Sequence, residues 1–448
     1  MRANRRNAVA FQAAQLVPFV TELQAARRVW VGFSGGLDST VLLHAMTRQL
    51  NPGKISAIHV NHQLSPAAHS WAQHCRAHCA VLGVALVEET VRIEKRGDGL
   101  EKAARELRYA VFEKVVEKND ILLLAHHADD QVETVLYRLL RGAGLRGLAG
   151  IPQSRALGCG RLLRPLLKFT RAELEAYGVR HGLSWIEDES NQHTEFDRNY
   201  LRHRVIPALA ERWPDFRTRI ALSADLCADA DRLNSVLARA DLDLLQERGE
   251  RLGRSIDIPA LQRLDPQRRA NVLRYWAETC GQIAPNQRAL LALHRDLLMV
   301  RGDAAPVVNW PGGQWRRFRQ RLYLLPPQFS RIAVQRAPVE WSLSEPLTLA
   351  DGSVLSAVGH VGQGLKVNPG QRVTIAWRSG GERCKPAGRH GSNSLKTLFQ
   401  EHGLEPWWRD RVPLLHVDGV LAAVGDLWLN DGFVVGPDEV GFVLCWNF

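Results

Sequence analysis

The stretch that most constrains this chain is VWVGFSGGLDSTVLL, residues 29–43. It begins with an apolar run of strand character and turns tightly at Ser34, Gly35 and Gly36, and an apolar run of helical character then starts near Asp38. Two adjacent glycines allow backbone dihedrals that other residues avoid, and they let the main chain approach a ligand closely. The new helix directs its free amide groups and the positive end of its dipole into the turn. The sequence therefore predicts an anion site here, of the kind that holds a phosphate.

The spacing of this turn separates it from two common phosphate-binding loops. The P-loop pattern ends in Gly-Lys-Ser/Thr, and no lysine stands here. The dinucleotide fingerprint G-x-G-x-x-G is also absent, because the two glycines are adjacent. The pattern S-G-G-x-D-S instead resembles the pyrophosphate loop of the N-type ATP pyrophosphatases. A glycine-rich turn without a ligand is the alternative, but hydroxyls and a carboxylate that could hold a metal ion flank the glycine pair, at Ser34, Asp38, Ser39 and Thr40.

Strand and helix signals alternate over the first 140 residues, which predicts an α/β fold with a parallel sheet. We expect strands at 29–33, 54–61, 84–91 and 121–125, and helices at 12–26, 66–82, 99–118 and 129–140. Ligands of such sheets bind at the carboxyl ends of the strands. The glycine-rich turn, residues 59–61 and His126-His127 all follow strand ends, so they should converge in one crevice.

The second group of polar residues lies in HHADDQVET, residues 126–134. Asp130 and Glu133 are three residues apart and therefore share one face of the predicted helix. Two acids beside a phosphate site suit a positively charged ligand such as an amine. A metal ion with His126 or His127 as co-ligand is a second interpretation. An ordinary acidic first turn with capping histidines is a third, and spacing alone does not choose among them.

Length, charge and cysteine usage set the wider class. The 448 residues allow about two to four domains. The net charge of +11 favours a polyanionic partner. Seven scattered cysteines without a CxxC pair are typical of a reducing compartment. Glu22 interrupts the apolar part of the basic N-terminus, which makes a poor signal peptide, and no run approaches the ~20 apolar residues of a membrane span. We expect a cytoplasmic protein with no membrane partner.

Seven motifs then occur in one order and together resemble tRNA(Ile)-lysidine synthases. They are SGGLDS, HVNHQ, GLEKAARELRY, HHADDQVET, RGAGLRGLAGI, RPLL and DESNQHTEFDRNYLRHRVIP. The resemblance is strong over residues 27–210 and weaker through the middle. It returns at residues 395–428, which are similar to the C-terminal domain of the long form of the family. It implies a Rossmann-like PP-loop ATPase domain at 1–215, a mostly helical tRNA-binding domain at 216–327 and a small α+β tRNA-binding domain at 340–448.

The resemblance also implies an activity and its substrates. The enzyme would ligate L-lysine to C2 of the wobble cytidine, position 34, in the CAU anticodon of tRNA(Ile), and so change codon specificity from AUG to AUA. ATP would adenylate O2 of the cytosine, and the ε-amine of lysine would then expel AMP. Mg²⁺ would accompany ATP, and no tightly bound metal or cluster is expected. A homodimer remains among the alternatives for the oligomeric state.

Residue roles follow from the same resemblance. Ser34, Gly35, Gly36, Leu37, Asp38 and Ser39 would hold the pyrophosphate part of ATP, with Asp38 near Mg²⁺. The main chain of residues 59–61 would contact adenine. Arg105, in preference to Arg108, would approach the α-phosphate. Asp130 and Glu133 would bind the lysine ammonium groups, and one of them could act as the base. The catalytic pocket would be closed by Arg198, Asn199 and Arg202.

Two further regions could contact RNA. The helix face with Arg263, Arg268, Arg269 and Arg274, and the loop with Arg378, Arg383, Lys385, Arg389 and Lys396, could either bind phosphates or be plain solvated surface. Trp407 and Trp408 could stack on a base or pack in a core. A tRNA thiolase is the nearest rival activity, but Cys75, Cys79 and Cys159 do not match its CxxC pattern. A non-catalytic RNA-binding module would not explain the presence of SGGLDS and HHADDQVET.

Overall fold

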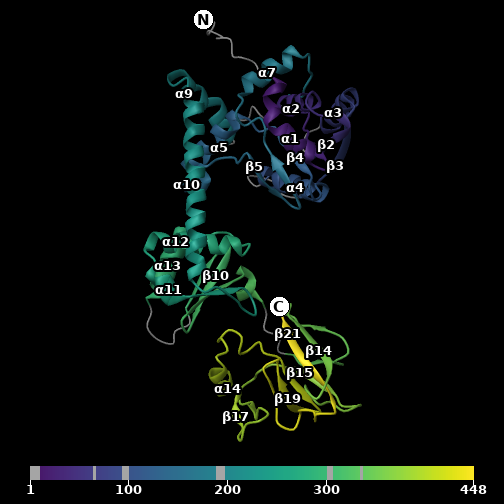
Figure 1. Cartoon of the computed structure of the whole chain (residues 1–448), viewed down its shortest axis with the longest axis vertical. Coiled ribbons are helices and arrows are strands. Elements are labelled where there is room, and N and C mark those ends of the chain that lie inside the picture. Colours follow the sequence, from purple (N-terminus) through teal and green to yellow (C-terminus); the bar gives the residue numbers. More distant parts are fainter. Residues whose placement is uncertain (1–10, 64–66, 93–99, 188–196, 300–305, 333–336) are drawn as a thin grey trace. The chain divides into compact units, whose positions relative to one another are not determined.

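The structure is a computed structural model that describes residues 11–63, 67–92, 100–187, 197–299, 306–332 and 337–448 (Figure 1). The chain divides into two compact units, Met1–Arg232 and Leu233–Phe448. One helix, α10 (Phe216–Leu244), runs across the boundary between them. The division into three domains at 1–215, 216–327 and 340–448 stays a prediction. Within the described residues, every helix is too short or too polar to cross a lipid bilayer.

The first unit is built on a six-stranded sheet with the order β3-β2-β1-β4-β6-β5. Its strands are β1 (Val29–Gly32), β2 (Ile55–Asn61), β3 (Ala85–Thr90), β4 (Ile121–Leu123), β5 (Ser154–Leu157) and β6 (Gly160–Leu163). All pairs are parallel except β5 with β6. The predicted α/β class with a parallel sheet is confirmed. Because β1 pairs with both β2 and β4, the strand order reverses at β1, and ligands bind at such a switch point.

Helices and short turns cover both faces of this sheet. They are η1 (Ala13–Leu16), α1 (Val17–Ala25), α2 (Leu37–Thr47), η2 (Pro52–Lys54), α3 (Ala68–Leu82), α4 (Leu100–Val115), α5 (Ala128–Leu140), α6 (Leu145–Leu148), α7 (Arg171–Arg180), α8 (Asp197–Tyr200), η4 (Leu201–Val205) and α9 (Ile206–Arg212). Val31 of β1 packs in one core with Leu42 of α2, whereas Trp30 packs on the opposite face with Phe112 of α4. Successive side chains of a strand point to opposite faces, so a strand covered on both sides is apolar throughout.

The second unit begins with a helical layer on a five-stranded antiparallel sheet, ordered β7-β8-β11-β10-β9. Its elements are β7 (Arg248–Gly249), β8 (Arg254–Asp257), α11 (Ile258–Arg263), α12 (Pro266–Thr279), α13 (Gln287–Leu293), η5 (His294–Leu298), β9 (Val307–Trp310), β10 (Gly313–Phe318) and β11 (Arg321–Leu325). Strands β9 and β10 form a hairpin around Pro311. Trp276 and Trp315, both fully buried, anchor the core between the helices and the sheet.

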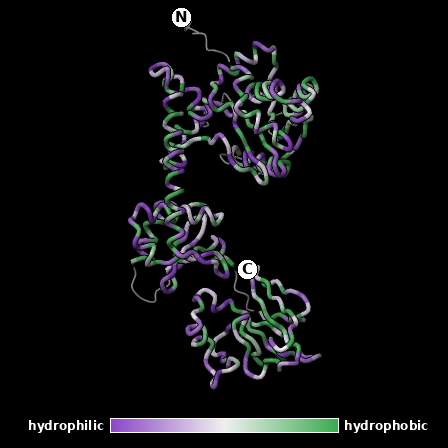
Figure 2. The backbone as a smooth tube through the Cα atoms, viewed as in Figure 1, coloured by the Kyte–Doolittle hydropathy of each residue, from purple (hydrophilic) through white to green (hydrophobic). Residues whose placement is uncertain are grey.

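The rest of the second unit is mostly β-structure. It comprises η6 (Pro327–Arg331), β12 (Val339–Glu340), β13 (Leu347–Thr348), β14 (Val354–Val361), β15 (Val373–Ala376), β16 (Arg383–Cys384), β17 (Asn393–Ser394), α14 (Leu395–His402), β18 (Leu414–Val417), β19 (Val420–Val424), β20 (Trp428–Leu429) and β21 (Val440–Asn447). Apolar segments run along its strands (Figure 2). Trp408 is 2% exposed in the core, and Trp407 packs edge-on against Tyr323 at 5.0 Å. Trp408 therefore packs in the core, which was one of the two interpretations of this tryptophan pair.

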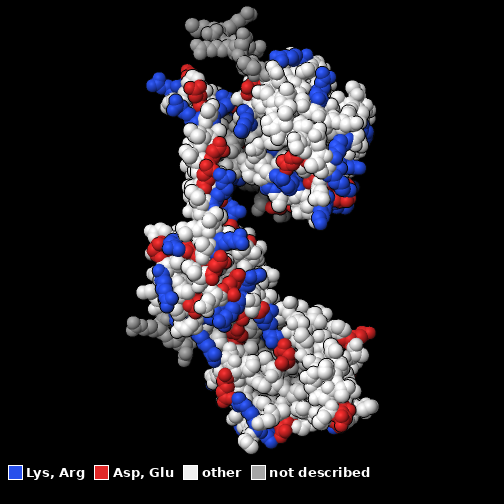
Figure 3. Space-filling view, in the orientation of Figure 1, with Lys and Arg blue, Asp and Glu red and all other residues white. Residues whose placement is uncertain are grey.

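Basic side chains of the second unit are largely engaged with the protein itself. Arg268 forms an ion pair with the buried Asp241, and Arg269 donates to the backbone oxygens of Leu261 and Leu264. Lys385 pairs with Asp431, and Arg389 pairs with Glu401. Acidic and basic side chains are interspersed on the face seen in Figure 3. Exposed ion pairs are weak, so the pairs at Lys385 and Arg389 can open to a phosphate, whereas Arg268 and Arg269 serve the fold.

Candidate active site

The SGGLDS loop joins the carboxyl end of β1 to the first turn of α2. Gly35 has a φ of +81°, and a Cβ there would lie 2.7 Å from Ile186 Cδ1 and 3.0 Å from Cys75 Sγ. The position therefore requires glycine both for its conformation and for space. Ser39 Oγ accepts from the Ser34 amide at 3.2 Å and donates to the Gly36 carbonyl at 3.0 Å, which fixes the shape of the loop.

The first amides of α2 are available to an anion. The earliest intrahelical bond runs from the Thr40 amide to the Gly36 carbonyl at 3.0 Å. The amides of Leu37, Asp38 and Ser39 precede it, and an α-helix offers its first amides no backbone partner. Gly36 is the N-cap, and within the described residues no side chain caps it. The loop has the donors that a pyrophosphate group needs.

The neighbouring strand end lies beside the loop, as the topology predicts. His59 of β2 is 5% exposed, and its Nδ1 lies 2.9 Å from the Phe33 carbonyl. The Phe33 amide donates to the Ile58 carbonyl at 2.8 Å, so β1 and β2 stay paired up to the turn. Residues 59–61 thus follow the same sheet edge as the glycine-rich loop.

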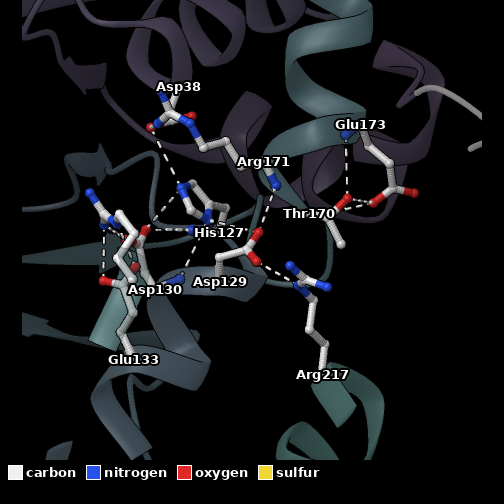
Figure 4. Close-up of polar contacts among 10 residues, drawn as sticks. Asp38, His127, Asp129, Asp130, Glu133, Thr170, Arg171, Glu173 and Arg217 are labelled. Atoms are coloured by element: carbon white, nitrogen blue, oxygen red, sulfur yellow. Dashed lines mark hydrogen bonds and ion pairs between the residues drawn. The ribbon is translucent and has the colours of Figure 1, made fainter. Parts of the chain in front are cut away.

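One histidine connects the two motifs. His127 follows β4 and is the N-cap of α5, where its Nδ1 accepts from the Asp130 amide at 3.4 Å. Its Nε2 lies 3.6 Å from Asp38 Oδ2 and 3.6 Å from Asp130 Oδ2, and its Nδ1 lies 3.8 Å from Asp129 Oδ2. Figure 4 shows these carboxylates around the ring of His127. The predicted convergence of SGGLDS with HHADDQVET is therefore seen as a direct contact.

Burial and charge act in opposite directions at this histidine. The ring is 2% exposed, and burial alone would lower the pKa of His127. The carboxylates of Asp38, Asp130 and Asp129 outweigh burial and raise this pKa above its ordinary value. Burial would likewise raise the pKa of Asp38, but His127, Arg171 and Arg202 outweigh it and lower that pKa. The two shifts have the directions expected where Nε2 of an imidazole faces a carboxylate.

The two predicted amine-binding acids share one cationic partner. Arg202 of η4 donates to Glu133 through Nε at 2.6 Å and through Nη2 at 2.9 Å, and its Nη2 lies 3.6 Å from Asp130 Oδ1. Two parallel bonds of this kind fix the orientation of both groups. Glu133 is 4% exposed, so burial raises its pKa, and Arg202 opposes that rise only in part. The structure brings Asp130, Glu133 and Arg202 together.

In the part of the chain that the structure describes, Arg105 contacts Tyr109 and not the glycine-rich loop. Its guanidinium carbon is 5.1 Å from the centre of the Tyr109 ring, and Nη2 lies 3.5 Å from the Tyr109 hydroxyl. The buried Arg164 donates to the same hydroxyl at 3.4 Å and to His126 Nδ1 at 3.2 Å. Within the described residues, Arg105 forms no hydrogen bond with the glycine-rich loop. It is placed beside the strand end through Tyr109 and Arg164 and not by direct contact.

Arg198 and Asn199 lie in α8, the helical turn directly before Arg202. After burial, the charges of Arg105 and Arg198 are the causes that lower the pKa of Arg138. These three guanidinium groups therefore belong to one cationic region beside the acids. Part of the DESNQHTEFDRNYLRHRVIP motif, residues 188–196, lies outside the described residues.

Three arginines of the site were absent from the prediction. Arg171 Nη1 lies 3.2 Å from Asp38 Oδ2, and the Arg171 amide donates to Asp129 Oδ2 at 2.9 Å. Arg217, at the start of α10, contacts Asp129 Oδ1 at 2.5 Å (Figure 4). Arg164 is the third. Arg164 belongs to the RPLL motif, and the capping box of Thr170 and Glu173 marks the start of α7 at Arg171.

The donors around Asp38 fit a hard cation. Asp38 Oδ1 is buried, and within the described residues no group donates a hydrogen bond to it. Mg²⁺ in nucleotide sites is usually bound by one or two carboxylates together with the phosphates of the substrate, so this single oxygen suffices. A metal on His126 or His127 has less support. The described residues contain no group of three metal-ligating side chains, and Arg164 already binds Nδ1 of His126.

Comparison with known proteins identifies the family. The model of a PP-loop domain matches residues 7–209, that of the TilS substrate binding domain matches 256–323, and that of the TilS substrate C-terminal domain matches 373–446. The tRNA(Ile)-lysidine synthase of Coxiella burnetii is 38% identical over 98% of this chain and 96% of its own length. That of Methylococcus capsulatus is 42% identical over 93% and 95%, and that of Serratia proteamaculans 39% over 95% and 97%. The chain belongs to the tRNA(Ile)-lysidine synthase family.

Proposed function

We propose that this chain ligates L-lysine to C2 of the wobble cytidine in the CAU anticodon of tRNA(Ile), with ATP as the energy source. The observation that carries the proposal is the contact of His127 with both Asp38 and Asp130, each at 3.6 Å. It sets a phosphate-binding loop beside two carboxylates that suit an amine. A ligase that activates one substrate with ATP and then adds an amine to it needs these two sites within one centre.

In the first step, O2 of the cytosine attacks the α-phosphate of ATP in line, and the bond to pyrophosphate breaks. The amides of Leu37, Asp38 and Ser39, with the hydroxyl of Ser34, hold the departing pyrophosphate. Arg105 stabilises the negative charge that grows on the α-phosphate, which is the kind of interaction that lowers a barrier most. Asp38 would hold Mg²⁺, which supplies neutralising charge to the phosphates when it is bound.

In the second step, the ε-amine of lysine attacks C2 of the adenylated cytidine and AMP leaves. Asp130 and Glu133 orient the amine, and Arg202 orients Glu133. The raised pKa of Glu133 makes its carboxylate a better proton acceptor than an ordinary glutamate. Arg198 and Asn199, which precede Arg202 in the chain, close the pocket over the base. The tRNA substrate places the reaction in the cytoplasm, and a homodimer stays a prediction.

The test is incorporation of radiolabelled lysine into RNA. The full chain is incubated with ATP, Mg²⁺ and a transcript of tRNA(Ile) carrying CAU, and the methionine tRNA transcript with the same anticodon is the control. We expect acid-precipitable label in the isoleucine transcript alone. Label in neither transcript, with ATP still split in the presence of RNA, would remove lysine as the nucleophile.

Such a result would favour a tRNA thiolase instead. The state of the cysteine thiols at this site argues against that activity. Cys75 and Cys79 are buried, and burial raises the pKa of each to about 12. Sulfur transfer requires the thiolate, which a buried apolar setting disfavours.

A further inference from the structure

The helix face that carries the two acids continues away from them along α5. Asp130, Glu133, Tyr137 and Arg141 are three, four and four residues apart, which aligns them along one side of the helix and its C-cap. With a rise of about 1.5 Å per residue, Arg141 lies about 12 Å along the axis from Glu133. A substrate that reacts at Glu133 therefore has its neighbouring groups near Tyr137 and Arg141.

Tyr137 and Arg141 form a cation–π pair. The guanidinium carbon of Arg141 is 5.2 Å from the centre of the Tyr137 ring, and Arg141 Nη1 donates to the Tyr137 hydroxyl. Arg141 is exposed and Tyr137 is partly buried, so the protein covers one layer of the stack and leaves the guanidinium side open. Aromatic rings and guanidinium planes are the surfaces on which unpaired nucleobases stack.

Three leucines beside this stack are exposed without an evident role in the fold. Leu139 is 55% exposed, Leu140 76% and Leu145 41%. Leu139 and Leu140 end α5 and Leu145 begins α6, and the loop between these helices is held in place from within. Arg138 Nη1 donates to the carbonyls of Gly147 at 3.0 Å and Gly150 at 2.8 Å. A fixed loop that presents apolar side chains to solvent is typical of a binding surface.

The charge of this region favours a polyanion. Arg138, Arg141 and Arg146 fall within nine residues. Burial and then the charges of Arg105 and Arg198 lower the pKa of Arg138, so five cations lie in or near the surface. Within the described residues, neither Arg138 nor Arg141 pairs with a carboxylate. A second copy of this chain would bring its own cations to the same place, whereas RNA brings phosphates.

We propose that Tyr137, Leu139, Leu140, Arg141 and Leu145, here called the loop platform, bind the unpaired anticodon nucleotides next to the wobble cytidine. One base stacks on the Arg141 guanidinium, the leucines cover the apolar face of the next, and the surrounding arginines take the phosphates. The inference rests on the proposed function, since it extends the binding site of that reaction. It assigns to the loop platform the positioning of the cytidine over Asp130 and Glu133.

The first experiment compares variants of the full chain in lysine incorporation. Arg141→Ala and Leu140→Ser remove the stack and the most exposed leucine. Arg48→Ala, at the far end of α2, and Val81→Ser, at a residue 86% exposed on α3, are the matched controls. We expect the KM for tRNA to rise about tenfold in the platform variants with kcat within threefold, because stacking contributes to binding. The controls should match the unchanged protein. An unchanged KM in both platform variants would overturn the proposal.

The second experiment observes the base directly. An anticodon stem-loop with 2-aminopurine on the 3′ side of the wobble cytidine is titrated with protein, and its fluorescence is measured. Stacking should quench the fluorescence with the unchanged protein but not with Arg141→Ala. Arg141→Lys keeps the charge and loses the plane, so the stem-loop should bind with little quenching.

These readouts distinguish a failure of the loop-platform proposal from a failure of the proposed function. If the unchanged protein incorporates no lysine, the proposed function fails, and quenching still reports on the loop platform. If Leu140→Ser changes the sedimentation coefficient and leaves the KM for tRNA unchanged, the leucines bind a second copy of the chain and the proposal is wrong.

Discussion

The ring of His127 lies 3.6 Å from Oδ2 of Asp38, and this contact joins the first turns of α2 and α5. The same ring caps α5 through its other nitrogen. His127 therefore both contacts Asp38 and caps α5, and two substitutions can separate these two roles. Asparagine is also a good N-cap, but its side chain is too short to bridge to Asp38.

We expect His127→Asn to fold with nearly unchanged stability and to lose about 100-fold in kcat/KM for lysine transfer, because Asp38 and Asp130 lose the imidazole between them. His127→Ala should show the same kinetic loss and about 1 kcal/mol less stability, because the cap is gone as well. Thermal unfolding and tRNA-dependent pyrophosphate release measure the two effects. Wild-type rates in the asparagine variant would mean that the bridge is dispensable.

Glu133→Gln should separate the two chemical steps. The amide still accepts a hydrogen bond from Arg202, so we expect a loss of about 1–3 kcal/mol in stability and a folded enzyme. Adenylation needs the loop and Arg105, and it should continue, whereas lysine transfer should fall at least 100-fold. Rapid-quench assays that follow pyrophosphate and lysidine separately give the comparison. Equal loss of both steps would contradict a role in the second step.

Gly35→Ala should disable the nucleotide loop. The φ of +81° and the approach of Ile186 Cδ1 to 2.7 Å leave no room for a methyl group. We expect a loss of about 1–3 kcal/mol and little remaining ATP binding, because the loop must shift to accept the side chain. Gly53→Ala is the matched control, since its nearest neighbour would be Asn51 Oδ1 at 3.4 Å. Nucleotide affinity by calorimetry and Tm by scanning calorimetry report the difference. Normal ATP binding by Gly35→Ala would count against the assigned loop.

Buried histidines should make the protein sensitive to mild acid. Burial, with the charges of His181, Arg48 and His78, lowers the pKa of His44 to about 4, and burial with Arg108 and His59 does the same at His62. A lowered folded-state pKa means that the neutral ring stabilises the fold, fully above the unfolded pKa near 6.5. That stability is lost as the pH falls from 6.5 towards 4, by about 1–3 kcal/mol.

Denaturant unfolding between pH 7.5 and 4.5 checks this dependence on acid. His44→Gln removes one of the titrating rings and should flatten the pH profile, whereas His69→Gln, at an exposed position of α3, should leave it unchanged. A profile with the same slope in all three proteins would show that these histidines do not contribute.

The elements that the sequence predicted are those with a clear period or a pure apolar run. Residues 29–33 and 121–125 carry no polar side chain, and they became the central strands β1 and β4. β5 and β6 were not predicted, because each has only four residues and a two-residue turn, Gly158 and Cys159, joins them. The five-stranded sheet of the second unit was also only partly predicted, because β7 and β8 are too short to show alternation.

The same distinction holds for the site, where some residues could be placed from sequence and others could not. Motifs at strand ends can be placed from sequence, since the topology of a parallel sheet brings those ends to one edge. The partners of Asp38 and Asp129 could not be predicted, because Arg171 and Arg217 come from distant helices and an isolated arginine carries no periodic signal. The role of the arginines on α12 could not be predicted for the same reason. Arg268 faces Asp241, which lies two helices earlier in the chain, in α10.

The ion pairs around His127 have one more consequence, for the state in which lysine reacts. Asp38, Asp129, Asp130 and Glu133 lie against Arg171, Arg202, Arg217 and the imidazole of His127, so four acids meet three guanidinium groups and one ring. An arriving ammonium ion therefore finds little surplus negative charge, while it loses its water. Such surroundings lower the pKa of an amine. In the proposed reaction, this enclosure would weaken binding of the protonated amino acid and favour an amine with a free electron pair on nitrogen near neutral pH.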